Sequence, residues 1–349
     1  MPVPVVALVG PTASGKSDLA IALASDSAAS RPVPGAAGPL PARGEIGGAG
    51  GHDSAASRPV SGAAGPLPAR GEIVNADSMQ LYRGMDIGTA KVPVSQRGGV
   101  PHHLLDVLDV SEAASVAQVQ RWARAAIDDI RGRGLLPIAV GGSALYMHAI
   151  LDRMEFPGTD PQVRRRLEHE AARFGDEAMH ARLAVHDPAA AQAIGAGNRR
   201  RVVRALEVIE LTGQPFTARL PEHEYALDPV CQIGLRVPRD VLTQRIRTRV
   251  AQMWAAGFVD EVRALERAGL RDGPTASRAL GYAQVLAYLD GGCTEAEAQE
   301  ATVRATNRFA RRQMTWYRRD HRIVWLDHDD PDLLDRARAA IATSSIATE

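Results

Sequence analysis

The sequence has little lysine, little cysteine and no net charge, and each shortage limits what the protein can be. Its 41 Lys and Arg residues balance 41 Asp and Glu residues over 349 positions. A balanced chain gives no whole-molecule electrostatic case for a nucleic acid or membrane partner, so a polyanion would need basic residues gathered on one face. The length is enough for one large or two modest globular units.

The only two cysteines, Cys231 and Cys293, lie far apart in the sequence. They form neither a disulfide framework nor a CxxC metal site, which favours a reducing compartment, and we expect the cytoplasm. The apolar run from Pro2 to Val9 is too short to span a membrane and has no basic flank or small-residue cleavage site. We therefore expect a first buried strand there, with no export signal and no membrane contact.

A tandem duplication interrupts the chain near its start. Asp26 to Ile46 recurs as Asp53 to Ile73, and the two copies differ only at Pro34 and Ser61. Both copies are rich in Ala, Gly, Pro, Ser and Arg and have no apolar period, so they cannot bury enough surface to offset the entropy of ordering. A solenoid would need more repeats, each with a stackable apolar face. We therefore predict that residues 26–72 form a disordered surface loop.

Elsewhere, short apolar segments alternate with helical ones, which predicts an α/β fold with a mostly parallel sheet flanked by helices. The predicted strands are Val3–Val9, Ile73–Ala76, Leu104–Val107, Leu135–Val140, Gln232–Val237 and Ile323–Leu326. From Asp160 to about Leu220 the pattern is helical and rich in arginine, with no strand. We therefore predict a core of residues 1–152 and 221–349, with an all-helical subdomain inserted at 153–220.

Two long helices are expected in the second half of the chain. One covers Pro238 to Gly257; the other runs from about Thr294 to Asp320 and opens with a Thr294/Glu297 capping box. On a helical wheel the second helix gathers its arginines on one side: Arg304, Arg308, Arg311, Arg312, Arg318 and Arg319. This pattern fits a solvated face and a polyanion-binding face equally well. Trp316 and Tyr317 fall on the opposite side, where we expect core packing.

A GxxxxGK[ST] motif follows the first predicted strand and precedes a helical run, which is the context that a P-loop requires. Small residues let the backbone N–H groups face a pyrophosphate, and the helix start adds a positive dipole. Lys16 would supply a point charge, and the Ser17 hydroxyl can ligate Mg²⁺. The predicted diphosphate-binding residues are Gly10, Pro11, Thr12, Ala13, Ser14, Gly15, Lys16 and Ser17.

A P-loop identifies a phosphate but not a reaction. No NKxD-type base-reading motif is present, and no hydrophobic strand ends in a Walker B aspartate. Small-molecule kinases and phosphate-binding transferases therefore remain. Asp77 follows the second predicted strand, and in open α/β sheets ligands bind at the carboxyl ends of the strands. At this stage Asp77 could bind Mg²⁺ through water, act as a base, or cap a helix.

Several motifs, in the correct order, resemble the tRNA dimethylallyltransferase (isopentenyl-tRNA transferase) family. They are GPTASGKS at Gly10, DSMQLYRGMDIGTAK at Asp77, PHHLLDVLDV at Pro101, GGSALY at Gly141, RRRVVRALEV at Arg199, QRIRTRVAQMWAAGFVDEV at Gln244, RALGYAQ at Arg278 and RRQMTWYRRD at Arg311. The resemblance covers nearly the whole chain outside the duplicated segment. This resemblance implies that the core has a P-loop NTPase-like fold.

The resemblance implies transfer of a dimethylallyl group from dimethylallyl diphosphate to N6 of the adenosine 3′-adjacent to the anticodon. The implied partners are this donor and the anticodon stem-loop of tRNA, and the implied cofactor is Mg²⁺, held by Ser17. The implied catalytic residues are Asp77 as the base, with Lys16 and Arg249 at the diphosphate. We also predict a monomer, although no sequence feature decides the oligomeric state.

The resemblance also places tRNA contacts on this chain. The implied contact residues are Asp77, Ser78, Met79, Gln80, Ser143, Arg164, Arg200, Arg201, Arg204, Arg278, Gly281 and Tyr282. Two positions depart from the family pattern. Ser143 stands where the family often has Thr, which keeps the hydroxyl, and Ala283 stands where a basic residue is common, which weakens a contact there.

Three other functions compete with this interpretation. A non-catalytic RNA-binding protein would have no need of the P-loop together with Asp77. A P-loop kinase of a small metabolite would need phosphoryl transfer, and an adenylate isopentenyltransferase would prenylate a free nucleotide; the helical insert with its arginines favours tRNA. Lys91 has no role derived from the sequence, and His102 and His103 are best explained as hydrogen-bonded structural residues.

Overall fold

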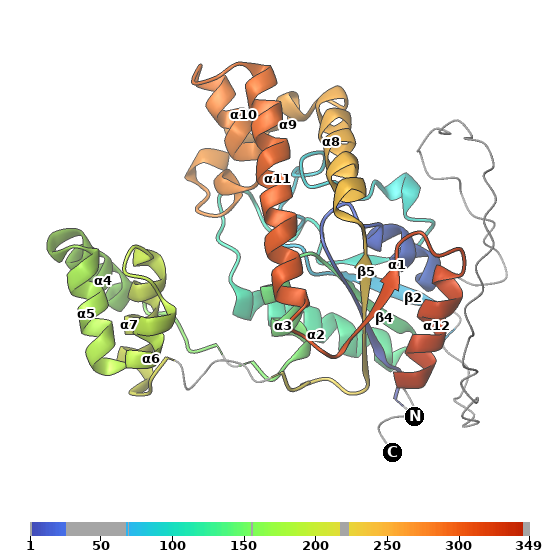
Figure 1. The fold of residues 1–349 in the computed structure, drawn as a ribbon, viewed down its shortest axis with the longest axis horizontal. Coiled ribbons are helices and arrows are strands. Elements are labelled where there is room, and N and C mark those ends of the chain that lie inside the picture. Colours follow the sequence, from blue (N-terminus) through green and yellow to red (C-terminus); the bar gives the residue numbers. More distant parts are fainter. Residues whose placement is uncertain (1, 26–67, 69, 155, 217–222, 345–349) are drawn as a thin grey trace, which may run out of the picture.

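The protein is built on a six-stranded sheet in which every neighbouring pair of strands is parallel (Figure 1). The computed structural model describes residues 2–25, 68, 70–154, 156–216 and 223–344. The strand order is β3-β2-β4-β1-β5-β6. The strands are β1 (Val5–Val9), β2 (Gly71–Asn75), β3 (His102–His103), β4 (Leu136–Val140), β5 (Val230–Arg236) and β6 (Ile323–Asp327). The predicted α/β class is therefore confirmed.

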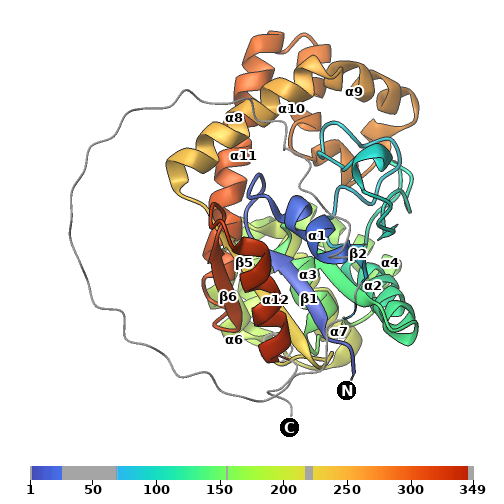
Figure 2. The ribbon, with the colours of Figure 1, turned by 90° about the vertical axis from the view of Figure 1, so that its right-hand side faces the viewer.

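Helices cover both faces of this sheet. The α-helices of the described residues are α1 (Lys16–Ala24), α2 (Val116–Gly132), α3 (Ala144–Leu151), α4 (Pro161–Phe174), α5 (Asp176–His186), α6 (Pro188–Ala193), α7 (Arg199–Thr212), α8 (Arg239–Ala255), α9 (Phe258–Arg267), α10 (Tyr282–Leu289), α11 (Glu295–Tyr317) and α12 (Leu333–Ser344). Side chains alternate across β1: Val6 and Leu8 pack with α1 and α12, while Val5 and Ala7 pack with α2 and α3. Figure 2 shows α1 and α12 together on one side of the sheet.

Helices α8 to α11 extend beyond the carboxyl ends of the strands (Figure 1). α8 begins after Pro238, and Gly257, with φ of 92°, starts the turn into α9. The predicted capping box of α11 is confirmed: the Thr294 hydroxyl accepts the Glu297 N–H, and the Glu297 carboxylate accepts the Thr294 N–H. These helices therefore stand over the edge of the sheet where the P-loop lies.

Helices α4 to α7 pack on one another around a hydrophobic cluster of their own, which includes Leu167, Leu183 and Leu206. Figure 1 shows them set to one side of the sheet. The chain leaves the body near Asp152 and returns at Tyr225, where the two connections form a single antiparallel bridge. None of the helices that the structure describes is both long and apolar enough to cross a membrane.

The structure corrects two expectations about strands. Leu104–Val107 is not a strand, because Leu104 (φ 61°) and Asp106 (φ 58°) turn the backbone, and β3 is only His102–His103. The disordered loop predicted for residues 26–72 also overlaps a strand. Gly71 and Glu72 belong to β2, and Glu72 is buried and pairs with Arg133 at 2.6 Å. The rest of the predicted loop, residues 26–67 and 69, lies outside the described residues.

Candidate active site

The predicted phosphate-binding loop connects β1 to α1 at the carboxyl edge of the sheet. Gly10 (φ 136°) and Gly15 (φ 96°) adopt backbone angles that side-chain-bearing residues rarely take, so the turn requires glycine at both. α1 begins at Lys16, directly after Gly15. The positive end of the α1 dipole therefore lies at the loop, where it favours an anion.

Lys16 is buried within this loop. Its Nζ donates to the Pro11 carbonyl at 2.6 Å and to the Ser14 hydroxyl at 3.4 Å. Burial and the positive charge of Arg249 together lower the pKa of Lys16 to about 7, although the negative charge of Asp77 acts against them. A phosphate anion beside Nζ would restore the charged form.

Asp77 lies just beyond the carboxyl end of β2, and Asn75 holds its backbone on both sides. The Asn75 Oδ1 accepts the Asp77 N–H at 2.9 Å, and the Asn75 Nδ2 donates to the Asp77 carbonyl at 3.0 Å. Burial raises the pKa of Asp77, while the Met79 N–H and the charge of Lys16 act against the rise. A raised pKa makes this carboxylate a stronger base than an exposed aspartate.

Lys16 and Asp77 share one cavity of about 340 Å³. The cavity is lined by Thr12, Ala13, Ser14, Gly15, Lys16, Ser17, Asp18, Asp77, Gln80, Thr89, Ala90, Lys91, Val92, Pro93, Gln96, Val140, Gly141, Gly142, Arg249 and Gln313. All three predicted catalytic residues therefore line one cavity, together with most of the P-loop. Its size and polar lining suit a phosphorylated small molecule.

Two side chains, one from α8 and one from α11, contact the P-loop from beyond the strand ends. Gln313 of α11 accepts the Thr12 N–H at 3.1 Å and donates to the Gly142 carbonyl at 2.8 Å, so it links the loop to the end of β4. Arg249 of α8 donates to the Thr12 hydroxyl at 3.5 Å, and burial lowers its pKa. Sequence reasoning assigned Gln313 no role, although this residue lies within the RRQMTW motif.

A carboxylate on α9 holds the loop that follows Asp77. Glu261 accepts three successive backbone N–H groups, from Asp86 at 3.1 Å, Ile87 at 2.7 Å and Gly88 at 3.1 Å. It also accepts the Tyr282 hydroxyl at 2.6 Å. We call these four bonds the Glu261 cradle. The GFVDEV motif contains Glu261, but sequence reasoning assigned it no role.

The buried side chain of Lys91 forms hydrogen bonds to the same loop. Its Nζ donates to the Tyr82 carbonyl at 3.0 Å and to the carboxylates of Asp86 and Asp106, both at 2.6 Å. Because the side chain is almost fully buried, these bonds fix its position. The loop carries Gln80, whose Nε2 donates to the Thr89 carbonyl at 3.1 Å at the cavity wall. Lys91 therefore has a structural role that sequence reasoning left open.

The predicted tRNA contacts fall into distinct environments. Asp77 and Gln80 line the cavity, and Ser78 and Met79 are partly buried between them. Ser143 caps α3, where its hydroxyl accepts the Tyr146 N–H at 3.5 Å.

Further predicted contacts lie in the RALGYAQ motif. Arg278 is exposed, whereas Gly281 and Tyr282 are buried. The Tyr282 side chain packs edge-on against Phe258 and donates to Glu261, so it presents no surface to RNA. The Tyr282 side chain therefore has a packing role, and an RNA contact at this position stays a prediction.

On the helical insert, Arg200 and Arg201 are exposed at the start of α7. Arg164 and Arg204 instead bind the fully buried Glu207, Arg204 at 2.8 Å. Burial raises the pKa of Glu207, but the hydrogen bonds from both arginines outweigh it and lower the pKa overall. These two arginines are therefore engaged within the insert.

All six arginines predicted to share one side are exposed: Arg304, Arg308, Arg311 and Arg312 lie on α11, and Arg318 and Arg319 directly follow its last residue. Tyr317 is buried as expected, but Trp316 is 54% exposed, so its predicted core position is wrong. The buried stripe at this end of the helix follows Gln313 and Tyr317, four residues apart. Trp316 is rotated by about 100° from that stripe.

The residues in the cavity fit a magnesium ion bound together with a diphosphate. Ser17 offers a hydroxyl at the start of α1, and the carboxylates of Asp18 and Asp77 also line the cavity. Hard oxygen donors suit Mg²⁺, which keeps several waters and binds substrate phosphates.

The chain is similar to known proteins over most of its length. A family model described as IPP transferase matches residues 80–320. The tRNA dimethylallyltransferase of Thermobifida fusca (strain YX) is 57% identical over 341 residues, which cover 98% of this chain and 95% of that protein. The protein of the same name from Kineococcus radiotolerans is 54% identical over 349 residues, which cover 99% of this chain and 98% of that protein.

A solved structure is also similar over the full length. It is the tRNA isopentenylpyrophosphate transferase of Bacillus halodurans, which is 35% identical with a TM-score of 0.63. The match covers 98% of each chain.

Proposed function

Because the chain belongs to the IPP transferase family of tRNA dimethylallyltransferases, we propose that it transfers a dimethylallyl group from dimethylallyl diphosphate to tRNA. The acceptor is N6 of the adenosine 3′-adjacent to the anticodon, and diphosphate is released. One observation carries the assignment of the site: Lys16 of the P-loop and the strand-end carboxylate of Asp77 line the same cavity. This arrangement joins an anion site to a base.

Asp77 acts as the general base. The N6 lone pair is delocalised into the adenine ring, so the amine is a poor nucleophile and gains from losing a proton as the new bond forms. In the transfer, the allylic C1–O bond breaks, the C1–N6 bond forms, and the N6 proton passes to the Asp77 carboxylate. The raised pKa of Asp77 suits this role.

The P-loop, Lys16 and Arg249 stabilise the leaving diphosphate. Negative charge accumulates on the diphosphate as the C1–O bond breaks, so donors on its oxygens stabilise the transition state more than the ground state. Lys16 and Arg249 both lose solvation in the cavity, and the pKa of each is lowered. An anion bound between Lys16 and Arg249 offsets the free-energy cost of their lost solvation. Ser17 would hold Mg²⁺, which supplies further positive charge at the diphosphate.

The target base must leave the anticodon-loop stack to reach Asp77, at a cost of a few kcal/mol. The residues proposed to contact the RNA are Asp77, Ser78, Met79, Gln80, Ser143, Arg200, Arg201 and Arg278, with the exposed arginine side of α11. Residues 153–220 form the tRNA-binding insert. We expect the enzyme to work as a monomer in the cytoplasm, where its RNA substrate is found.

The test incubates the protein with dimethylallyl diphosphate, Mg²⁺ and either tRNA or AMP. The RNA is digested, and mass spectrometry locates any C5H8 adduct. We expect the adduct on adenosine of tRNA alone. An adduct only on AMP would identify an adenylate isopentenyltransferase, and phosphate transfer from ATP to a metabolite would identify a kinase; either result refutes the proposal.

A further inference from the structure

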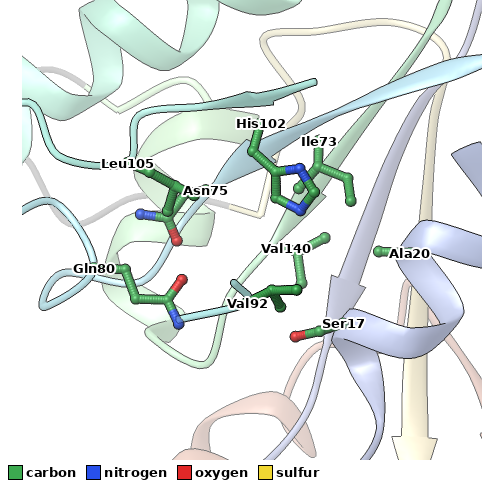
Figure 3. Close-up of a pocket in the computed structure, with 9 residues that line it drawn as sticks. All are labelled: Ser17, Ala20, Ile73, Asn75, Gln80, Val92, His102, Leu105 and Val140. Carbon is green, nitrogen blue, oxygen red and sulfur yellow. The ribbon is translucent and has the colours of Figure 1, made fainter. Parts of the chain in front are cut away.

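A small apolar recess opens from the side of the active-site cavity (Figure 3). Its volume is about 30 Å³. Ser17, Gln80, Val92 and Val140 line both the recess and the larger cavity, so the two spaces adjoin. The recess is therefore next to the residues proposed to hold the diphosphate and the base.

The far wall of the recess is built from regular structure. Ala20 comes from α1, Ile73 from β2 and His102 from β3, and Figure 3 shows their side chains converging. Ala20 and Ile73 are buried, and Ile73 belongs to the hydrophobic cluster under α1. Ala20 on the packed helix α1 and Ile73 on β2, inside the sheet, cannot move aside easily, whereas His102 stands on the edge strand β3.

Among the described residues, no charged group lines the recess, and three of its four polar side chains, Asn75, Gln80 and His102, bond to nearby backbone; the fourth, Ser17, lies on the side that the recess shares with the larger cavity. Asn75 bonds to the Asp77 backbone and to the Leu104 carbonyl. Gln80 donates to the Thr89 carbonyl. His102 bonds to the Val100 carbonyl at 2.8 Å, and burial lowers its pKa, which favours the neutral ring. A recess of this kind suits a hydrocarbon better than water.

The volume of the recess also limits the size of the group that it can hold. A water-sized group needs roughly 10–15 Å³ of such space, so the recess takes about two groups. A dimethylallyl chain ends in two methyl groups, and the next longer isoprenoid, geranyl, adds five more carbons. We propose that the recess holds the two methyl groups of the donor and that Ala20, Ile73 and His102 form its end wall, which excludes longer isoprenoid diphosphates. This inference rests on the proposed function.

The experiment offers dimethylallyl and geranyl diphosphate together, at equal concentration, to the full-length enzyme with Mg²⁺ and tRNA. Mass spectrometry measures the ratio of C10H16 to C5H8 adducts on the RNA. We expect the wild type to give only the C5H8 adduct. Ile73→Ala opens the end wall, and we expect it to raise the ratio at least tenfold, in line with the effect of about one methylene on pocket selectivity.

Val74→Ala is the matched control. It lies on the same strand, but its side chain packs on the opposite face of the sheet, so it tests for general loosening and should leave the ratio unchanged. Val92→Ala gives a second opened variant at a partly exposed position, in case Ile73→Ala does not fold.

Three results would overturn the inference: a wild type that uses both donors equally, a ratio that stays unchanged in both opened variants, or an equal rise in Val74→Ala. A wild type that puts neither donor on tRNA would instead refute the proposed function itself, so the two failures can be told apart.

Discussion

Replacing Glu261 by Gln should destabilise the loop that follows Asp77, the proposed catalytic base. The carboxylate accepts the N–H groups of Asp86, Ile87 and Gly88 and the hydroxyl of Tyr282. A carboxylate can accept four such bonds, whereas an amide has one oxygen and one NH₂ group. Whichever way the amide turns, its NH₂ group faces at least one backbone N–H, so the cradle cannot be rebuilt.

The cost follows from the bonds lost. A hydrogen bond to a charged group contributes about 1.5–3 kcal/mol, and a neutral one about 0.5–1.5 kcal/mol. Asp86 is exposed, so water replaces part of its bond. We therefore expect Glu261→Gln to lower the free energy of unfolding by roughly 2–4 kcal/mol. Folded domains have about 5–15 kcal/mol in total, so the variant should still fold.

Urea unfolding measures this loss, and a graded pair of variants isolates it. Tyr282→Phe removes one bond of the cradle, made to the charged carboxylate, and should cost about 1.5–3 kcal/mol. Asp260→Asn is the control on the same helix: its side chain is 80% exposed and pairs with Arg263, so it should change stability by less than about 0.5 kcal/mol. Turnover should fall in Glu261→Gln while tRNA affinity is kept. If Glu261→Gln costs no more than Asp260→Asn, the cradle stabilises nothing.

Three further predictions concern charged groups. Asp77→Ala should lower turnover by about 10²–10⁴-fold while tRNA binding, measured by filter retention, is unchanged; lost affinity with normal turnover would make Asp77 a binding residue. Diphosphate binding near pH 8 should take up about one proton, because an anion raises the lowered pKa of Lys16; calorimetry in two buffers should detect this uptake in the wild type and not in Lys16→Met. Glu207→Gln should cost about 3–5 kcal/mol because it breaks the buried pairs with Arg164 and Arg204. Since the pKa of Glu207 is lowered from its ordinary 4.5, its contribution is present above pH 4.5 and is lost as the pH falls below it, so the wild type should lose stability more steeply in acid than the variant.

Features set by local sequence were the ones that could be predicted. The P-loop, the strand-end position of Asp77 and the α11 capping box depend on residues within a few positions of one another. The Glu261 cradle and the Gln313 link could not be derived this way. Glu261 reaches residues 173 to 175 positions away, and Gln313 reaches Thr12 across 301 positions. The hydrophobic periodicity of a sequence does not show which residues so far apart will form hydrogen bonds.

Two of the wrong predictions have the same cause. A helical wheel places Trp316 on the apolar side, but it does not show which neighbours cover that side near the end of α11. The apolar run Leu104–Val107 has the composition of a strand, yet Asn75 holds the Leu104 carbonyl and Lys91 holds the Asp106 carboxylate, so the backbone turns there. In both cases distant residues decide the local structure.

The scarcity of lysine makes the active site chemically addressable. Lys16 and Lys91 are the only lysine amines in the sequence. Both amines are buried at the wall of the cavity, but Lys91 is bound by two carboxylates, which keep it from an acylating reagent. Lys16 faces the cavity with a pKa of about 7, so much of it is an uncharged nucleophile near neutral pH. A small amine-reactive label should therefore mark Lys16 ahead of Lys91, and inorganic diphosphate should protect it.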